Sequence, residues 1–142
     1  MKVKAYVSGV LTGGDEIQEL KKFYERIADA CTAAGIEAYV PHRVSDPVAN
    51  PDMTPDAVYD LDRQQVLDSN LLIAYIGLPS LGGGMEIEIA REKNIPVVVL
   101  MEKDRRISRI ARGNPAVIAE IHFKDFEDAI AQLTVWLKEW KA

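Results

Sequence analysis

The sequence predicts an α/β fold of the flavodoxin-like kind, a three-layer sandwich around a five-stranded parallel sheet. Two observations support this prediction. The apolar segments 71–76 and 97–101 show no polar alternation, as expected for strands buried on both faces of a parallel sheet. Segments with helical spacing alternate with such strands, and this alternation places helices on both faces of the sheet. With 142 residues, no linker and no internal repeat, we expect a single domain over 1–142.

The first strand is expected over 3–7, followed by a glycine-bearing loop from Ser8 to Gly14. Asp15 is expected to cap the next helix, which continues to about residue 34 and stops at Gly35. Apolar residues recur along this helix at helical spacing, which indicates one buried face.

A second short strand is expected over 36–40. The segment 42–53 contains prolines and has no hydrophobic period, so it is interpreted as a long loop, and such loops in compact domains are often functional. Thr54 as cap and Pro55 in the first turn then open a helix that is expected to end near residue 69.

The centre of the sequence combines a strand, a glycine-rich loop and a helix. The strand over 71–76 ends before Pro79 and the glycines 82–84, and a helix is expected to begin near Met85. Glu86 would then lie in the first helical turn, where the positive end of the helix should keep its carboxylate ionised at neutral pH. Ligands of open α/β sheets bind at the carboxyl ends of the strands, so Glu86 is the candidate nucleophile.

The remaining segments complete the alternation. A strand over 97–101 precedes a charged, helical stretch over 102–112. A last strand is expected over 117–123 and a closing helix over 125–140.

Composition narrows the class of partner. The formal charge of −5 argues against a nucleic-acid polymer as the main partner, although a local site for a small nucleotide remains possible. The single cysteine, Cys31, is interpreted as a buried, inert thiol. No signal peptide is visible and no apolar run is long enough for a bilayer, so no membrane partner and a cytoplasmic location are expected.

Two carboxylates are the main candidates for chemistry. Asp62 shares a helix face with Tyr59 and Val66, so it is expected to point inward, where a carboxylate is costly unless it is paired or used. The alternative is a buried aspartate that is bonded to a loop amide. For Glu86 the alternative is a favourable acid at a helix start, whereas Glu88 is assigned to a solvated face.

The end of the first strand supplies further candidates. Tyr6 and Ser8 alternate with Val7, so both side chains should line the carboxyl-edge crevice. The Tyr6 hydroxyl would orient Glu86, while Ser8 and the amides from Gly9 onward would bind an oxyanion or a sugar hydroxyl. His42 follows the second strand and is expected to reach the same crevice. The spacing of the histidines does not predict a metal site.

These residues together resemble the nucleoside 2-deoxyribosyltransferase superfamily over nearly the whole chain. The resemblance lies in Tyr6-x-Ser8-Gly9, in Asp62, and in Gly82-Gly83-Gly84-Met85-Glu86-Ile87-x-Ile89-Ala90. It implies that Glu86 attacks the anomeric carbon of a nucleoside and forms a covalent glycosyl-enzyme. It also implies that Tyr6 orients Glu86, that Asp62 assists proton movement at the base, and that no metal or organic cofactor is needed.

Two branches of this superfamily fit the sequence. Pro79-Ser80-Leu81-Gly82 resembles the loop of the 2′-deoxynucleoside 5′-monophosphate N-hydrolases, whose serine binds phosphate. Ser108 resembles a hydrolase serine that reaches the phosphate in a neighbouring subunit. Met85 is closer to the transferases. The resemblance thus implies the following substrate-binding residues: Ser8, Gly9, His42, Ser80, Gly82, Gly84, Met85 and Ser108.

The function favoured by the sequence is a nucleoside 2-deoxyribosyltransferase that exchanges the base of a (deoxy)ribonucleoside through an intermediate on Glu86. The alternative is a 2′-deoxynucleoside 5′-monophosphate N-glycosidase, and a third hypothesis is a non-catalytic nucleotide-binding module. The expected partners are nucleosides or nucleoside monophosphates and free nucleobases, with a role in nucleotide salvage. The resemblance also implies a homodimer or higher homo-oligomer with shared active sites.

Overall fold

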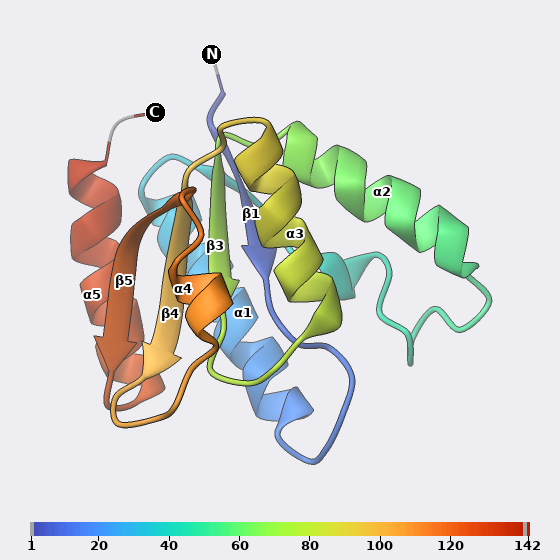
Figure 1. Ribbon diagram of the computed structural model, residues 1–142, viewed down its shortest axis with the longest axis horizontal. Coiled ribbons are helices and arrows are strands. Elements are labelled where there is room, and N and C mark those ends of the chain that lie inside the picture. The colour runs from blue at the N-terminus through green and yellow to red at the C-terminus, as the bar shows by residue number, and fades with distance from the viewer. Residues whose placement is uncertain (1, 141) are drawn as a thin grey trace.

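The computed structural model describes residues 2–140 and 142 and confirms the predicted fold class. Its sheet has five parallel strands in the order β2-β1-β3-β4-β5 (Figure 1). This is the order of the flavodoxin-like arrangement. The strands are β1 (Lys4–Ser8), β2 (Glu37–Tyr39), β3 (Leu71–Tyr75), β4 (Val97–Glu102) and β5 (Val117–Phe123).

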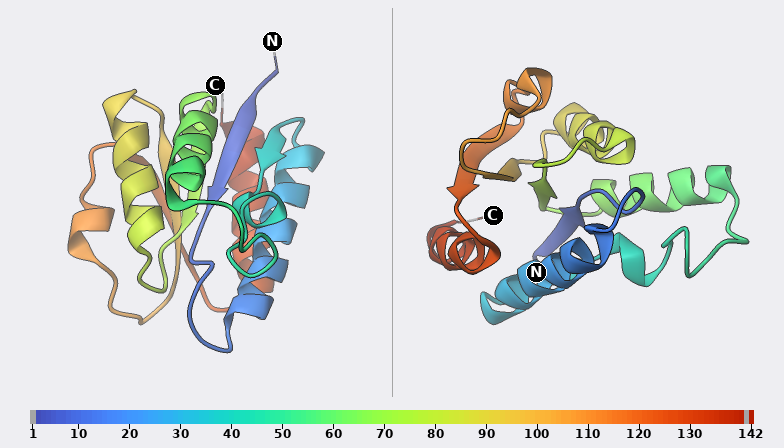
Figure 2. Two further views of the ribbon diagram at one scale, coloured as in Figure 1. Left: turned by 90° about the vertical axis from the view of Figure 1, so that its right-hand side faces the viewer. Right: turned by 90° about the horizontal axis from the view of Figure 1, so that it is seen from below.

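Helices cover both faces of this sheet, with α1 and α5 on one face and α2 and α3 on the other (Figure 2). The helices are α1 (Ile17–Ala33), α2 (Pro55–Leu67), α3 (Leu81–Glu92), α4 (Arg109–Arg112) and α5 (Phe126–Glu139), with a short 3-10 helix η1 (Pro41–Arg43).

The central strand β3 explains why its sequence lacks polar alternation. Every residue of β3 is buried. Leu71, Ile73 and Tyr75 pack toward α1 and α5, while Leu72 and Ala74 pack toward α2 and α3. Both faces of the strand are therefore core, as expected for a covered parallel sheet.

Three predicted details of the helices are wrong. Helix α3 begins at Leu81 rather than near Met85, because the Ser80 hydroxyl caps it by accepting the Gly83 amide at 3.0 Å. Helix α1 begins at Ile17 without a side-chain cap from Asp15. Within the predicted helical stretch 102–112, only the four residues of α4 are α-helical.

The position of α3 matters most for the site. The three glycines lie inside its first turn, so Glu86 lies in the second turn. The free backbone amides at the helix start therefore lie closer to Ser80 and Gly82 than to Glu86.

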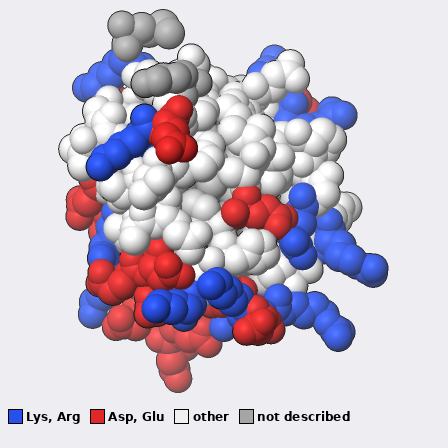
Figure 3. Space-filling view, turned by 90° about the vertical axis from the view of Figure 1, so that its left-hand side faces the viewer, with Lys and Arg blue, Asp and Glu red and all other residues white. Residues whose placement is uncertain are grey.

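Two further predictions concern Cys31 and the surface. Cys31 is fully buried, as predicted, and this burial raises the pKa of its thiol to about 12. On the face that carries α5, acidic and basic side chains lie close together rather than forming a continuous basic surface (Figure 3). Among the described residues, no helix combines the length and apolarity needed to cross a bilayer.

Candidate active site

A cavity of about 510 Å³ opens at the carboxyl end of β1, between α2, the start of α3 and the segment 41–53. This is the sheet edge at which the sequence predicts a crevice. Three charged side chains line it: Asp62 and Arg63 from α2, and Glu86 from α3.

Glu86 is held by two hydroxyl groups from β1. The Tyr6 hydroxyl donates a hydrogen bond to Glu86 Oε2, and Ser8 Oγ donates to Oε1 at 2.7 Å. Tyr6 and Ser8 lie two residues apart on one face of the strand, and both are fully buried. The carboxylate is thereby fixed in orientation while its residue still lines the cavity.

The environment of Glu86 raises its pKa to about 7. Burial is the main cause, and the negative charge of Asp62 adds to it, while the hydrogen bonds from Tyr6 and Ser8 act in the opposite direction. The predicted stabilisation of the ionised form by the helix start is therefore wrong. Because α3 begins five residues before Glu86, the dipole effect has faded at its position and desolvation dominates.

Asp62 lines the same cavity from α2, as its helical spacing predicts. The Ser45 hydroxyl lies 3.5 Å from Asp62 Oδ1 and 3.3 Å from the Pro41 carbonyl oxygen, so its one proton has two acceptors within reach. The contact of Asp62 is with a side chain rather than with the loop amide of the alternative interpretation. Burial raises the pKa of Asp62, although the Ser45 hydrogen bond lowers it in part. A carboxyl group of this kind retains a proton more readily than a solvated aspartate does.

The predicted binding residues fall into three groups. The first group lines the cavity with Glu86: Gly9, Ser80, Gly82 and Met85. Ser8 forms the second group, since its hydroxyl contacts Glu86 but its side chain is buried and does not line the cavity. The third group lies outside the cavity: Gly84 and Ser108, which line a neighbouring hollow between α3 and α4, and His42.

The predicted position of His42 is wrong. Its Nε2 atom lies 2.7 Å from Glu25 Oε2, and its ring lies beside Tyr24. Pro41 starts η1 two residues after the end of β2, and the resulting turn directs the His42 side chain toward α1 instead of into the cavity. His42 therefore joins the segment 41–53 to α1 and does not line the cavity.

Sequence reasoning missed Arg63, Tyr39 and Ser45. Arg63 lies four residues after Tyr59 and three before Val66, so it belongs to the same helix face as Asp62 and could have been predicted from the spacing. Tyr39 stacks on Tyr6 at 5.4 Å between ring centroids, because the two residues are register partners in β2 and β1. No local signal in the sequence indicates the contacts of Tyr39 or Ser45.

The titration of Glu86 gives a direct test of this geometry. We expect its carboxyl carbon to titrate near pH 7 in a ¹³C NMR experiment. Ser8→Ala should raise this midpoint, because the Ser8 hydroxyl stabilises the charged form, and Asp62→Asn should lower it by removing a like charge. A Glu86 midpoint unaffected by both substitutions contradicts the assigned environment.

Comparisons with known proteins agree with the resemblance. No protein-family model matches the chain. It is 31% identical over 137 residues to a Methanosarcina mazei protein provisionally named 2′-deoxynucleoside 5′-phosphate N-hydrolase 1, covering 94% of this chain and 83% of that protein. A Methanosarcina barkeri protein with the same provisional name is 35% identical over 115 residues, which cover 79% of this chain and 70% of the relative.

Solved structures show the same fold. The Clostridium botulinum CMP N-glycosidase superposes with a TM-score of 0.72 at 20% identity, covering 94% of this chain and 98% of that chain. A 2-deoxyribosyltransferase from Bacillus psychrosaccharolyticus superposes with a TM-score of 0.65 at 15% identity, covering 92% and 96%. The sequence identity to the named relatives and the shared fold point to the same family. The chain belongs to the nucleoside 2-deoxyribosyltransferase superfamily, which includes the 2′-deoxynucleoside 5′-phosphate N-hydrolases.

Proposed function

We propose that this protein hydrolyses the N-glycosidic bond of 2′-deoxynucleoside 5′-monophosphates and releases the base. The observation that carries the proposal is the Glu86 carboxyl group, which two buried hydroxyls orient at a cavity that Asp62 also lines. The cavity volume of about 510 Å³ is in the range of small-ligand sites. The N-hydrolase names of the relatives support this branch of the superfamily over the transferase that the sequence favours.

The proposed reaction has two displacements at C1′. In the first, an ionised Glu86 oxygen bonds to C1′ as the C1′–N bond breaks, and protonated Asp62 donates its proton to the leaving base. In the second, water attacks C1′, gives a proton to Asp62 and frees Glu86, with 2-deoxyribose 5-phosphate as product. A carboxylate next to C1′ also stabilises the positive charge that develops on the sugar.

The start of α3 is the proposed phosphate site. Ser80 and Gly82 line the cavity there, and the free amides of a helix start favour an anion. A Cβ on Gly82 would meet no protein atom within 4 Å, so packing within the chain does not explain this glycine. A closely approaching phosphate would use that open space, since any other residue would place a side chain there.

Base transfer is the second candidate function. It shares the first displacement and differs only in whether a second base or water attacks C1′. Met85 favours it, because this residue resembles the transferases and lines the cavity with half of its surface exposed.

We also propose that the chain acts as one domain and assembles as a homo-oligomer. Ser108 lies outside the cavity of its own chain, in the hollow next to Leu81 and Ile110, which are 93% and 88% exposed. An interface over these apolar side chains would remove them from water and bring a Ser108 close to the site of a neighbouring copy.

Product analysis tests the proposed function. A 2′-deoxynucleoside and its 5′-monophosphate are each incubated with the enzyme, with and without a second free base, and the products are separated by chromatography. We expect free base from the monophosphate, at least ~100-fold slower release from the nucleoside because the hydrogen bonds to the charged phosphate are lost, and no new nucleotide. A new nucleoside or nucleotide that carries the second base supports transfer instead.

Two glycine variants control for the phosphate site. Gly82→Ala and Gly84→Ala should each stabilise α3 by up to about 1 kcal/mol, because both positions are helical and open. Gly82→Ala should reduce kcat/KM for the monophosphate more than Gly84→Ala does, since Gly82 lines the cavity and Gly84 lines the neighbouring hollow. Equal activity of the two variants would contradict a phosphate at the start of α3.

A further inference from the structure

The wall formed by the segment 41–53 is held mainly by polar contacts. Its side chains Pro47, Asn50 and Met53 line the cavity. Apolar burial contributes little, because Val44 and Val48 are 44% and 78% exposed. By contrast, the polar residues Ser45 and Asp46 of this segment are 6% and 4% exposed, which is uncommon for a loop.

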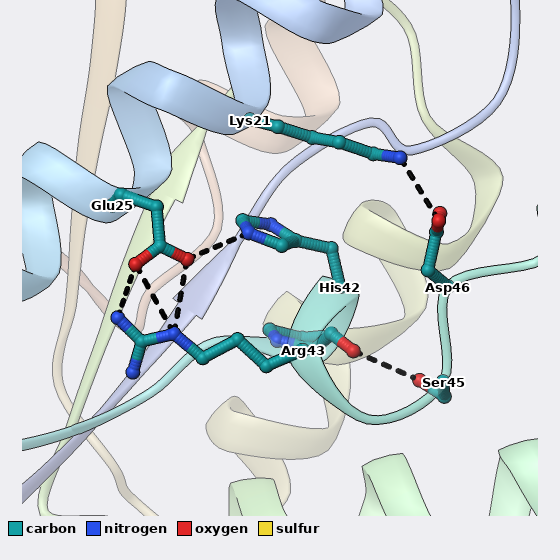
Figure 4. A network of polar contacts seen from close by, with 7 residues as sticks. Lys21, Glu25, His42, Arg43, Ser45 and Asp46 are labelled. Carbon is teal, nitrogen blue, oxygen red and sulfur yellow. Dashed lines mark hydrogen bonds and ion pairs between the residues drawn. The ribbon is translucent and has the colours of Figure 1, made fainter. Parts of the chain in front are cut away.

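Two residues of α1, Lys21 and Glu25, join this segment to the helix (Figure 4). Lys21 Nζ lies 3.0 Å from Asp46 Oδ2, and four residues further along α1, Glu25 accepts hydrogen bonds from His42 and Arg43. Residues four apart share one helix face, so Lys21 and Glu25 both face the segment 41–53. There the Lys21 cation meets Asp46, and the Glu25 anion meets Arg43 and His42. The Lys21 and Asp46 side chains are only 15% and 6% exposed, whereas those of Arg43 and Glu25 are 46% and 40% exposed.

Asp46 also organises the turn that follows it. Its carboxylate accepts the Ala49 amide at 3.2 Å, and its carbonyl accepts the Asn50 amide at 2.7 Å. The preceding residue, Ser45, places its hydroxyl 3.5 Å from Asp62 Oδ1. The residue that pairs with Lys21 therefore accepts both hydrogen bonds of the cavity-lining turn and directly follows the residue whose hydroxyl lies near Asp62.

We propose that Lys21 and Asp46 are positioning residues for the reaction: their ion pair holds the segment 44–50 where it faces the base and where Ser45 supports Asp62. This inference rests on the proposed function, in which Asp62 protonates the leaving base. Removing Lys21 leaves the Asp46 charge buried without its cation, a costly state that favours displacement of the segment. The loss should fall on protonation of the base, because the contacts of Glu86 with β1 do not involve this segment.

The test compares substrates with two kinds of leaving group. One is a 2′-deoxynucleoside 5′-monophosphate, and the other is 4-nitrophenyl 2-deoxyriboside 5-phosphate, whose nitrophenolate leaves without a proton. Lys21→Met should lower kcat/KM for the nucleotide about 30-fold, within the ~100-fold that a misplacement of 1 Å can cost. The same variant should lower kcat/KM for the nitrophenyl substrate less than ~3-fold, because that leaving group needs no acid.

Matched variants separate positioning from general damage to α1. Arg26→Met removes an exposed ion pair of the same helix, with Glu127, and should leave both substrates unchanged. Lys21→Arg keeps the cation and should restore most of the nucleotide activity. If Lys21→Met fails to fold, Asp46→Asn replaces it, because an asparagine oxygen can still accept the Ala49 amide while the charge that pairs with Lys21 is lost. Asp46→Asn should show the same larger loss for the nucleotide than for the nitrophenyl substrate.

A second readout does not depend on activity. The amides of Ser45 and Asn50 donate to the carbonyls of Pro41 and Asp46, and their hydrogen exchange should be at least ~10-fold faster in Lys21→Met than in Arg26→Met. Exchange and turnover equal to those of Arg26→Met overturn the inference. An equal loss for both substrates that Lys21→Arg does not rescue also overturns it. A wild-type protein that releases no base refutes the proposed function alone, since hydrogen exchange still decides whether the pair holds the segment.

Discussion

Replacing Glu86 by glutamine is expected to lower base release at least ~1000-fold, because the side chain that bonds to C1′ is lost while its shape is kept. The measurement is kcat/KM for the preferred 2′-deoxynucleotide at pH 8. Glu88→Gln is the matched control. Glu88 lies two residues further along α3, is exposed, and contacts Asn114 outside the cavity. It should retain full activity.

The same substitution is expected to stabilise the fold at high pH. The folded-state pKa of Glu86 is about 7 against an ordinary value of 4.5, so the folded protein binds more protons between these values and loses stability as the pH rises through this range. Well above pH 7 the cost is complete, about 3 kcal/mol. Glu86→Gln should therefore raise the free energy of unfolding at pH 8 and leave it nearly unchanged at pH 4.

Two results would contradict this account of Glu86. Turnover of Glu86→Gln close to that of Glu88→Gln would exclude Glu86 as the nucleophile. A stability difference at pH 4 as large as that at pH 8 would show that desolvation of the ionised form is not the cause of the raised pKa.

Replacing Asp62 by asparagine is expected to lower kcat/KM for an ordinary nucleotide about 100-fold, because the leaving base loses its proton donor. The loss should shrink with bases that leave more easily, and this dependence is measured with a series of substituted bases. Burial raises the pKa of Asp62, so in the wild type the proton should be available above the usual range of an aspartate. The descending limb of the pH profile should disappear in Asp62→Asn.

Asp60→Asn is the control for this second prediction. Asp60 lies on α2 two residues before Asp62, but it is exposed and does not line the cavity. We expect no change in activity or in the pH profile. An equal loss in Asp62→Asn for good and poor leaving groups would refute the acid role and leave a binding role.

Hydrophobic patterns within short segments of the sequence were sufficient to predict the α/β architecture. Continuous apolar runs predicted the buried strands, and the last strand, Val117–Phe123, has the predicted bounds. Strand alternation also placed Tyr6 and Ser8 on one face, and helical spacing turned Asp62 inward. These features follow from the periods of two and of about 3.6 residues, which are properties of the backbone and are visible in any sequence that obeys them.

Only the tertiary structure decided the pKa of Glu86 and the contacts that hold the cavity-lining segment. Ser80 caps α3 ahead of its glycines, which moves Glu86 away from the helix start and leaves burial in control of its pKa. The turn at Pro41 directs His42 to Glu25, and Lys21 on α1 pairs with Asp46 in the segment that faces the cavity. Desolvation and ion pairing depend on distances between groups that are far apart in the chain. No local pattern encodes those distances, and only the packed fold sets them.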